Sequence, residues 1–289
     1  MSHYTTSLTN HTTENYLKHA EFVFSDQHAS PILSMLNPQP GQAIVDLGAG
    51  TGHLTVKIKQ AVGDSGTVVG IDSSEDMLKH ANISAVQLGI RYFKGDIQDY
   101  TTLDPCLEGK FDLAFSSATF HWCKAYPGGV VETIKWLLKP GGRAVFEFGG
   151  FGNTVGVRAA LHEVVNRHGG DATKVDPWYF PTAQQYSKLL IKHGMQPQQV
   201  HLVPRPTPLS TDMVGWLKTF ARNTFMAEFD QKEADEMMKE VSEMTRPDAF
   251  WCDSAPGTGM VAASTCGQGC ASGWEIMYVR LRGIAHKAS

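Results

Sequence analysis

The chain has 289 residues, 42% of them hydrophobic and 19% charged, so it can bury a substantial core. Its net charge of −4 argues against a general nucleic-acid binder, and no apolar run of about 18 residues suggests a membrane span. The polar first 30 residues do not resemble a signal peptide, and five unevenly spaced cysteines favour a reducing, cytoplasmic setting over a disulfide framework.

Short apolar runs alternate with amphipathic stretches in the first half of the chain. We expect strands over 43–48, 67–72, 90–96, 110–117 and 143–148. The stretches between them carry apolar residues at helical spacing, and "LKPGG" at 138–142 ends the last of these helices. Strands that alternate with helices are typical of a doubly wound, Rossmann-like α/β sheet.

The second half is expected to be mostly helical. Helices are predicted over 157–165, 183–193, 213–224 and from Asp230, and strands over 200–209 and 274–287. The stretch 252–273, rich in Gly, Ala, Ser and Cys, is predicted to be a long loop.

Three glycines follow the first predicted strand in "VDLGAGTGHL" (45–54). Gly48, Gly50 and Gly52 permit a tight turn and a close approach of a ligand to the backbone, at the start of a helix. A dinucleotide-binding turn has a small residue where this chain has His53, which counts against a pyrophosphate. An NAD(P)-dependent oxidoreductase nevertheless stays open as an alternative.

Two carboxylates end the next two strands. Asp72 is placed to accept hydrogen bonds from ribose hydroxyls, and Asp96 to accept one from the exocyclic amine of a base. Together with the glycines they describe a pocket for an adenosine without phosphates.

These residues resemble the class I S-adenosylmethionine-dependent methyltransferases. The match consists of "VDLGAGTG", the acidic end of the second strand, "GDI" (95–97) and "LKPGG", in order and spacing. Further motifs, among them "SSATFHWC" (116–123), "YFPTAQQY" (179–186) and "YVRLRGIAHK" (278–287), are similar to the trans-aconitate methyltransferase branch, from which 252–273 departs.

The resemblance implies a mostly parallel seven-stranded sheet with a helical cap, and S-adenosyl-L-methionine as cofactor. It divides the chain into an N-terminal helical lid (1–40), a cofactor-binding core (41–150), an acceptor-binding cap (151–250) and a closing segment (251–289). The cofactor-binding residues that it implies are Tyr16, Asp46, Gly48, Ala49, Gly50, Gly52, Asp72, Ser73, Met77, Asp96, Ile97, Ser116 and His121.

A sulfonium methyl group is already activated, so the protein has to align the acceptor and exclude water. A carboxylate acceptor, with a pKa near ~4, is ionised and needs no base. A hydroxyl, amine or carbon acceptor needs one, and His121 is the candidate base or orienting residue. A purely structural histidine beside the cofactor is the alternative.

The helical cap is expected to bind a small-molecule acceptor. Arg158 and Arg222 are candidates to pair with an acid, with solvated surface arginines as the alternative. Trp122, Tyr179, Phe180, Trp216 and Phe220 are candidates for the pocket wall, unless they are plain core. Cys266 and Cys270 lack further ligands, so no metal is expected.

The function that these expectations favour is methylation of a carboxylic acid to its methyl ester, by a monomer or homodimer. Methylation of a hydroxyl or carbon, and a member of the fold that does not methylate, stay open beside the oxidoreductase.

Overall fold

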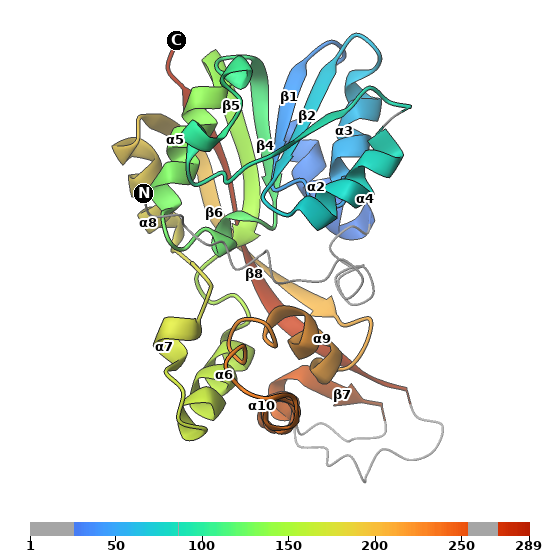
Figure 1. Cartoon of the computed structure of the whole chain (residues 1–289), viewed down its shortest axis with the longest axis vertical. Coiled ribbons are helices and arrows are strands. Elements are labelled where there is room, and N and C mark those ends of the chain that lie inside the picture. The colour runs from blue at the N-terminus through green and yellow to red at the C-terminus, as the bar shows by residue number, and fades with distance from the viewer. Residues whose placement is uncertain (1–25, 86, 254–270) are drawn as a thin grey trace.

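The protein is described by a computed structural model over residues 26–85, 87–253 and 271–289. Its centre is a seven-stranded sheet in the order β3-β2-β1-β4-β5-β8-β6 (Figure 1). The parallel strands are β1 (Ala43–Leu47), β2 (Thr67–Asp72), β3 (Arg91–Lys94), β4 (Phe111–Ser117) and β5 (Leu138–Gly149). The last strand in the chain, β8 (Ser272–Lys287), pairs antiparallel with both β5 and β6 (Met195–Pro208). The predicted Rossmann-like, mostly parallel sheet is confirmed.

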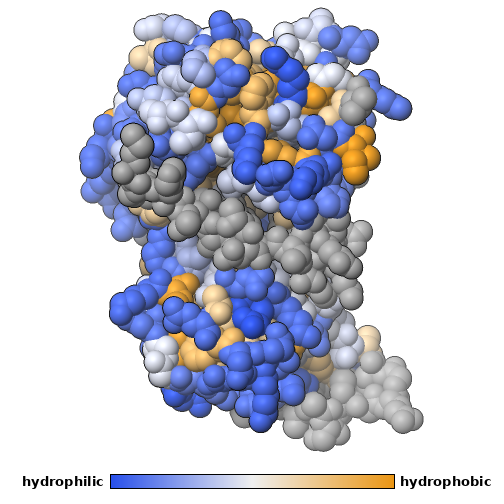
Figure 2. Space-filling model, in the orientation of Figure 1, coloured by the Kyte–Doolittle hydropathy of each residue, from blue (hydrophilic) through white to orange (hydrophobic). Residues whose placement is uncertain are grey.

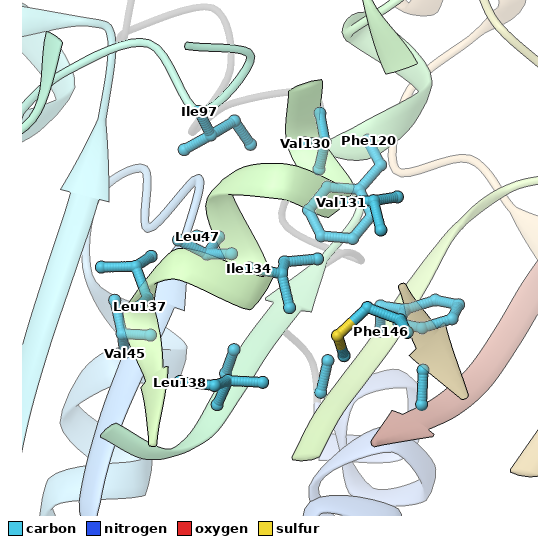
Figure 3. Close-up of a cluster of buried hydrophobic side chains, with 14 of the residues drawn as sticks. Val45, Leu47, Ile97, Phe120, Val130, Val131, Ile134, Leu137, Leu138 and Phe146 are labelled. Atoms are coloured by element: carbon cyan, nitrogen blue, oxygen red, sulfur yellow. The ribbon is translucent and has the colours of Figure 1, made fainter. Parts of the chain in front are cut away.

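Helices cover both faces of this sheet. On one face α2 (Asp26–Leu36) and α3 (His53–Val62) bury Ile32, Leu36 and Ile58. On the other face lie α5 (Pro127–Leu137) and α8 (Ala183–Lys192). Figure 3 shows Ile134 and Leu137 of α5 among buried side chains of the sheet, including Val45 and Leu47. Because both faces are covered, the strands read as continuous apolar runs.

A second lobe lies beyond the carboxyl ends of the parallel strands (Figure 1). The strands β6 and β8 run on into it, and α6 (Val155–Arg167), α9 (Met213–Phe220) and α10 (Gln231–Ala249) pack there around a separate apolar core. The short helix α7 (Ala172–Val175) follows α6, while α4 (Glu75–Ala85) belongs to the sheet lobe. The acceptor-binding cap predicted over 151–250 corresponds in part to this lobe.

Several boundaries differ from those predicted. The "LKPGG" segment, predicted to form the turn between a helix and a strand, is the first part of β5. Its first residue, Leu138, pairs with Phe111. The ends of the predicted loop 252–273 are strand residues, because β7 (Phe250–Cys252) pairs with the start of β8. The helix α9 ends at Phe220, four residues before the predicted end.

The cysteines and the helix lengths bear on two further expectations from the sequence. Cys106 and Cys123 are free thiols, whereas Cys252 is disulfide-bonded, although the sequence favoured a reducing setting over a disulfide framework. The side of the molecule that is seen in Figure 2 is largely hydrophilic. Within the described residues, no helix is both long enough and apolar enough to cross a membrane.

Candidate functional site

The glycine turn after β1 has left-handed backbone at all three glycines, with φ of 76° at Gly48, 55° at Gly50 and 82° at Gly52. A Cβ at Gly48 would overlap the Thr119 side chain, and one at Gly52 would overlap the Tyr92 hydroxyl. A Cβ at Gly50 would meet no described atom within 4 Å. Gly50 therefore borders open space, as a turn that a ligand approaches closely requires.

Asp72, at the end of β2, holds this turn in place. Its Oδ2 accepts a hydrogen bond from the Gly50 N–H at 2.8 Å, and its Oδ1 accepts one from the Ser74 N–H at 2.8 Å. Burial raises the pKa of this carboxyl. Each carboxylate oxygen has a second lone pair, so the same group can still accept bonds from a ribose.

Asp72 and Asp96 line one cavity at the carboxyl ends of β2 and β3. The full lining is Gly48, Asp72, Ser73, Gly95, Asp96, Ile97, Thr119 and Cys123. Burial also raises the pKa of Asp96, which accepts a hydrogen bond from the Gln98 N–H at 2.9 Å. Two carboxyl groups, with no cationic side chain among these described lining residues, suit an adenosine with a positive sulfur and disfavour a pyrophosphate.

Other residues predicted for the cofactor lie beneath the turn rather than in the cavity lining. Asp46 is buried at the end of β1, where its Oδ2 accepts a hydrogen bond from Thr55 Oγ1 at 2.6 Å. Burial raises the pKa of Asp46 to about 7. Ser116 Oγ donates to the Leu47 carbonyl at 2.7 Å, and Met77 is buried at the start of α4. Tyr16 lies outside the described residues.

A second cavity lies between the sheet and the cap. Its lining is Ala118, His121, Trp122, Asn153, Thr154, Trp178, Phe180, Trp216, Phe220, Tyr278 and Arg280. The loop after β4 borders both cavities, with Thr119 and Cys123 in the first and Ala118, His121 and Trp122 in the second. Ligands in the two cavities would therefore lie on either side of one short loop.

His121 is a neutral hydrogen-bond donor in this arrangement. The Gly149 N–H donates to its Nδ1 at 3.2 Å, so Nδ1 carries no proton and the neutral ring carries its proton on Nε2. Burial, and then the charge of Arg280, hold the pKa of His121 well below its usual value. A ring in this state can orient an acceptor by donating from Nε2, but that nitrogen has no lone pair to accept a proton.

Three arginines surround a single buried carboxylate beside the second cavity. Arg205 on β6 and Arg282 on β8 both pair with Glu147 on β5, the first at 3.3 Å. The Nε of Arg280 lies 4.0 Å from Glu147 and is buried without a hydrogen-bond partner in the part of the chain described. The charge of Arg280 is therefore the least compensated of the three, and it faces the cavity.

The structure brings four of the seven predicted acceptor residues to this cavity: Trp122, Phe180, Trp216 and Phe220. The other three lie elsewhere. Tyr179 packs against the sheet core, Arg158 pairs with the buried Asp176 at 2.6 Å, and Arg222 donates to the Met226 and Phe229 carbonyls.

Arg280 was missed although the sequence carries a signal for it. In "MYVRLRG" the residues Tyr278, Arg280 and Arg282 alternate, so they share one face of a strand. Charged side chains in a strand that also carries the apolar Leu281 need a partner or a ligand. Nothing in the sequence indicates that Thr119 and Cys123 would join the first cavity.

Residues 44–142 match a family model described as a methyltransferase domain. The chain is 28% identical to an uncharacterized methyltransferase of Schizosaccharomyces pombe, over 95% of this chain and 96% of that protein. It is 30% identical to an uncharacterized methyltransferase of Geobacillus kaustophilus, over 56% of this chain and 73% of that protein. It is 35% identical to the trans-aconitate 2-methyltransferase of Deinococcus radiodurans, over 41% of this chain and 43% of that protein.

Solved structures share the fold. One from Bacillus halodurans, described as a methyltransferase, has a TM-score of 0.58 at 14% identity and covers 91% of this chain and 100% of its own. A Haemonchus contortus phosphoethanolamine N-methyltransferase, solved with S-adenosylhomocysteine, has a TM-score of 0.56 at 17% identity, over 96% of this chain and 57% of its own.

Proposed function

Because the chain belongs to the S-adenosylmethionine-dependent methyltransferases, we propose that it methylates the carboxylate of a small acid to give a methyl ester. S-adenosylmethionine, when bound, supplies an activated methyl group. The proposal concerns the acceptor and the residues that hold it.

The observation that carries the proposal is Arg280. Its side chain is 4% exposed and lines the cavity next to the cofactor-binding cavity. A buried guanidinium without a full ion pair is costly, and an acceptor carboxylate that pairs with it removes that cost. A neutral acceptor would leave the charge uncompensated.

The state of His121 supports an acid over a hydroxyl or carbon acceptor. Because Nδ1 is occupied by the Gly149 N–H, the ring can donate from Nε2 to an acceptor oxygen but cannot take a proton there. A carboxylate is ionised at neutral pH and requires no base. The name of one relative, trans-aconitate 2-methyltransferase, gives an acid anion as the acceptor of that protein.

We assign the cofactor to the first cavity. Asp72 and Ser73 would hold the ribose, Asp96 and Ile97 the adenine, and Asp46 with the turn from Gly48 to Gly52 the methionine part. Two observations support this assignment. The two lining carboxylates, when ionised, accept hydrogen bonds and donate none, and the space beside Gly50 is open.

Replacing Arg280 by Met tests the acceptor assignment. The loss of one charged hydrogen bond, roughly 1.5–3 kcal/mol, should lower kcat/KM for acids by about 10- to 150-fold. The affinity for S-adenosylmethionine, measured by calorimetry, should stay unchanged. The matched control is Arg222→Met, which removes a guanidinium that binds two backbone carbonyls away from the cavity. Unchanged turnover of acids by Arg280→Met, or faster methylation of phenols than of acids by the wild type, would contradict the proposal.

A further inference from the structure

We infer that the acceptor is an aromatic monocarboxylic acid with one further hydrogen-bonding group, bound through Thr154. This inference rests on the proposed function, because it names the class of acid that the second cavity accepts. Three features of that cavity carry it: its walls, its single cation and one unpartnered hydroxyl.

The walls of the second cavity are aromatic. The side chains of Trp122, Trp178, Phe180, Trp216, Phe220 and Tyr278 line it, beside the imidazole of His121. Trp178 stacks on Phe180 with ring centroids 5.6 Å apart, and Trp216 lies 5.0 Å from Phe220. Such walls favour a flat, apolar acceptor body, which can stack on them or meet their edges.

The polar ends of two of these rings bond to each other. The Trp216 Nε1–H donates to the Tyr278 hydroxyl at 2.7 Å. These two side chains therefore present mainly their apolar faces to an acceptor. Because the Trp216 N–H is engaged in this bond, a body rich in polar groups would lose its hydration and gain few bonds from these two side chains.

One cation among the described lining residues faces this space. Arg280 lines the cavity, whereas Arg205 and Arg282 bind Glu147 from outside the lining. One carboxylate can pair with Arg280, but a second or third would be buried against aromatic rings without a partner. The cavity thus selects a monoacid over a di- or tricarboxylate.

Thr154 supplies a further polar contact, beside His121 and Asn153, which also line the cavity. Its backbone is left-handed, with φ of 50°, which is unfavourable for a β-branched residue. The Thr154 N–H donates to the Met277 carbonyl at 3.1 Å, which holds this conformation. The side chain is buried, lines the cavity, and its Oγ1 has no hydrogen-bond partner among the described residues. A buried hydroxyl without a partner is unfavourable, so a ligand group that bonds to it gains affinity.

Competition among acids tests the size and charge of the acceptor. Methyl-labelled S-adenosylmethionine is incubated with benzoate, phenylacetate, 4-hydroxyphenylacetate, trans-aconitate and citrate, and ester formation is followed by mass spectrometry. The aromatic monoacids should exceed the tricarboxylates in kcat/KM by at least tenfold. Preferred methylation of a tricarboxylate would overturn this inference and leave the proposed function standing. Turnover of none of the acids would overturn both.

Two matched variants test Thr154 itself. Thr154→Ser keeps the hydroxyl, and Thr154→Ala differs from it by that one oxygen atom. Across a series of hydroxylated aromatic acids, the best substrate should lose about tenfold more kcat/KM in the Ala variant than in the Ser variant. The parent acid without the hydroxyl should not distinguish the two variants. Equal kinetics of both variants on every acid would overturn the role of Thr154, provided that their melting temperatures agree.

Discussion

Gly48, Gly50 and Gly52 share a positive φ, but each lacks a side chain for a different reason. At Gly48 and Gly52 the space is already filled by Thr119 and Tyr92, whereas Gly50 borders open space. The first two glycines are therefore required by packing, whereas at Gly50 we expect the open space to be needed for the cofactor.

Substituting alanine for Gly50 and, separately, for Gly48 distinguishes the need for space for a ligand from the need for packing. Gly50→Ala should cost roughly 1–2 kcal/mol of unfolding free energy, the strain of a left-handed alanine, and weaken S-adenosylmethionine binding. Gly48→Ala should cost more, because it adds an overlap with Thr119. Urea denaturation and calorimetry measure both quantities. Equal losses of stability in the two variants would contradict this account of the turn.

We expect Asp46 to make cofactor binding depend on pH. Burial raises its pKa to about 7 in the free protein, so acidification protonates it, whereas the ammonium group of the cofactor favours the ionised form. Affinity for S-adenosylmethionine should therefore fall by roughly 10- to 30-fold as the pH drops from 7.5 to 5.5. Asp46→Asn should bind more weakly at pH 7.5, and its affinity should not vary with pH. The same pH dependence in the variant would assign the proton to another group.

Residues at strand ends could be predicted from the sequence, whereas residues brought together by packing could not. Asp72 and Asp96 follow directly from the positions of two strands, and the structure places both in one cavity. Arg280 lies on the last strand. Its charge is poorly compensated because Arg205 and Arg282 already pair with the Glu147 carboxylate. That competition for one carboxylate depends on which strands are neighbours, and spacing along the chain does not reveal it.

At the scale of elements, the segment between α7 and α8 brings Trp178 and Phe180 to the second cavity. Asp176 fixes it: its carboxylate accepts hydrogen bonds from Arg158 and His162 on α6 and from the Trp178 N–H. Its carbonyl accepts a bond from Lys124 Nζ in the sheet lobe at 2.6 Å. The segment is thus held from both lobes.

Asp176→Asn should loosen this segment. The substitution should lower the free energy of unfolding by roughly 2–3 kcal/mol. This value lies between those for exposed and buried ion pairs, because Arg158 is about one-third exposed. The KM for the acid should rise several-fold, while the affinity for S-adenosylmethionine stays the same. Asp171→Asn is the control, because this exposed residue caps α7 and asparagine caps equally well. A loss of cofactor affinity equal to the loss for the acid would argue against a local role.

Element types were easier to predict than their ends. Apolar periodicity identified the parallel strands and α5, whose Ile134 and Leu137 are fully or almost fully buried. The start of β5 was not predictable in the same way, because Leu138 joins the strand through its pairing with Phe111. Proline and glycine at 140–142 indicate a turn, but the neighbouring strand decides the pairing.

For the whole molecule, we expect the two lobes to divide cofactor binding and acceptor binding between them. The sheet lobe provides the cavity with two carboxyl groups, and the cap together with β8 provides the aromatic cavity with Arg280. The long strands β6 and β8 belong to both lobes (Figure 1), and the loop after β4 borders both cavities.

The central claim is that the transferred methyl group ends on a carboxylate oxygen. The most direct measurement is the stability of the labelled product in base, after incubation of the wild-type protein with methyl-labelled S-adenosylmethionine and an aromatic acid. A methyl ester should release all of its label as methanol on mild alkaline treatment. Label that stays on the acceptor after this treatment would show an ether or a carbon–methyl bond and would contradict the account.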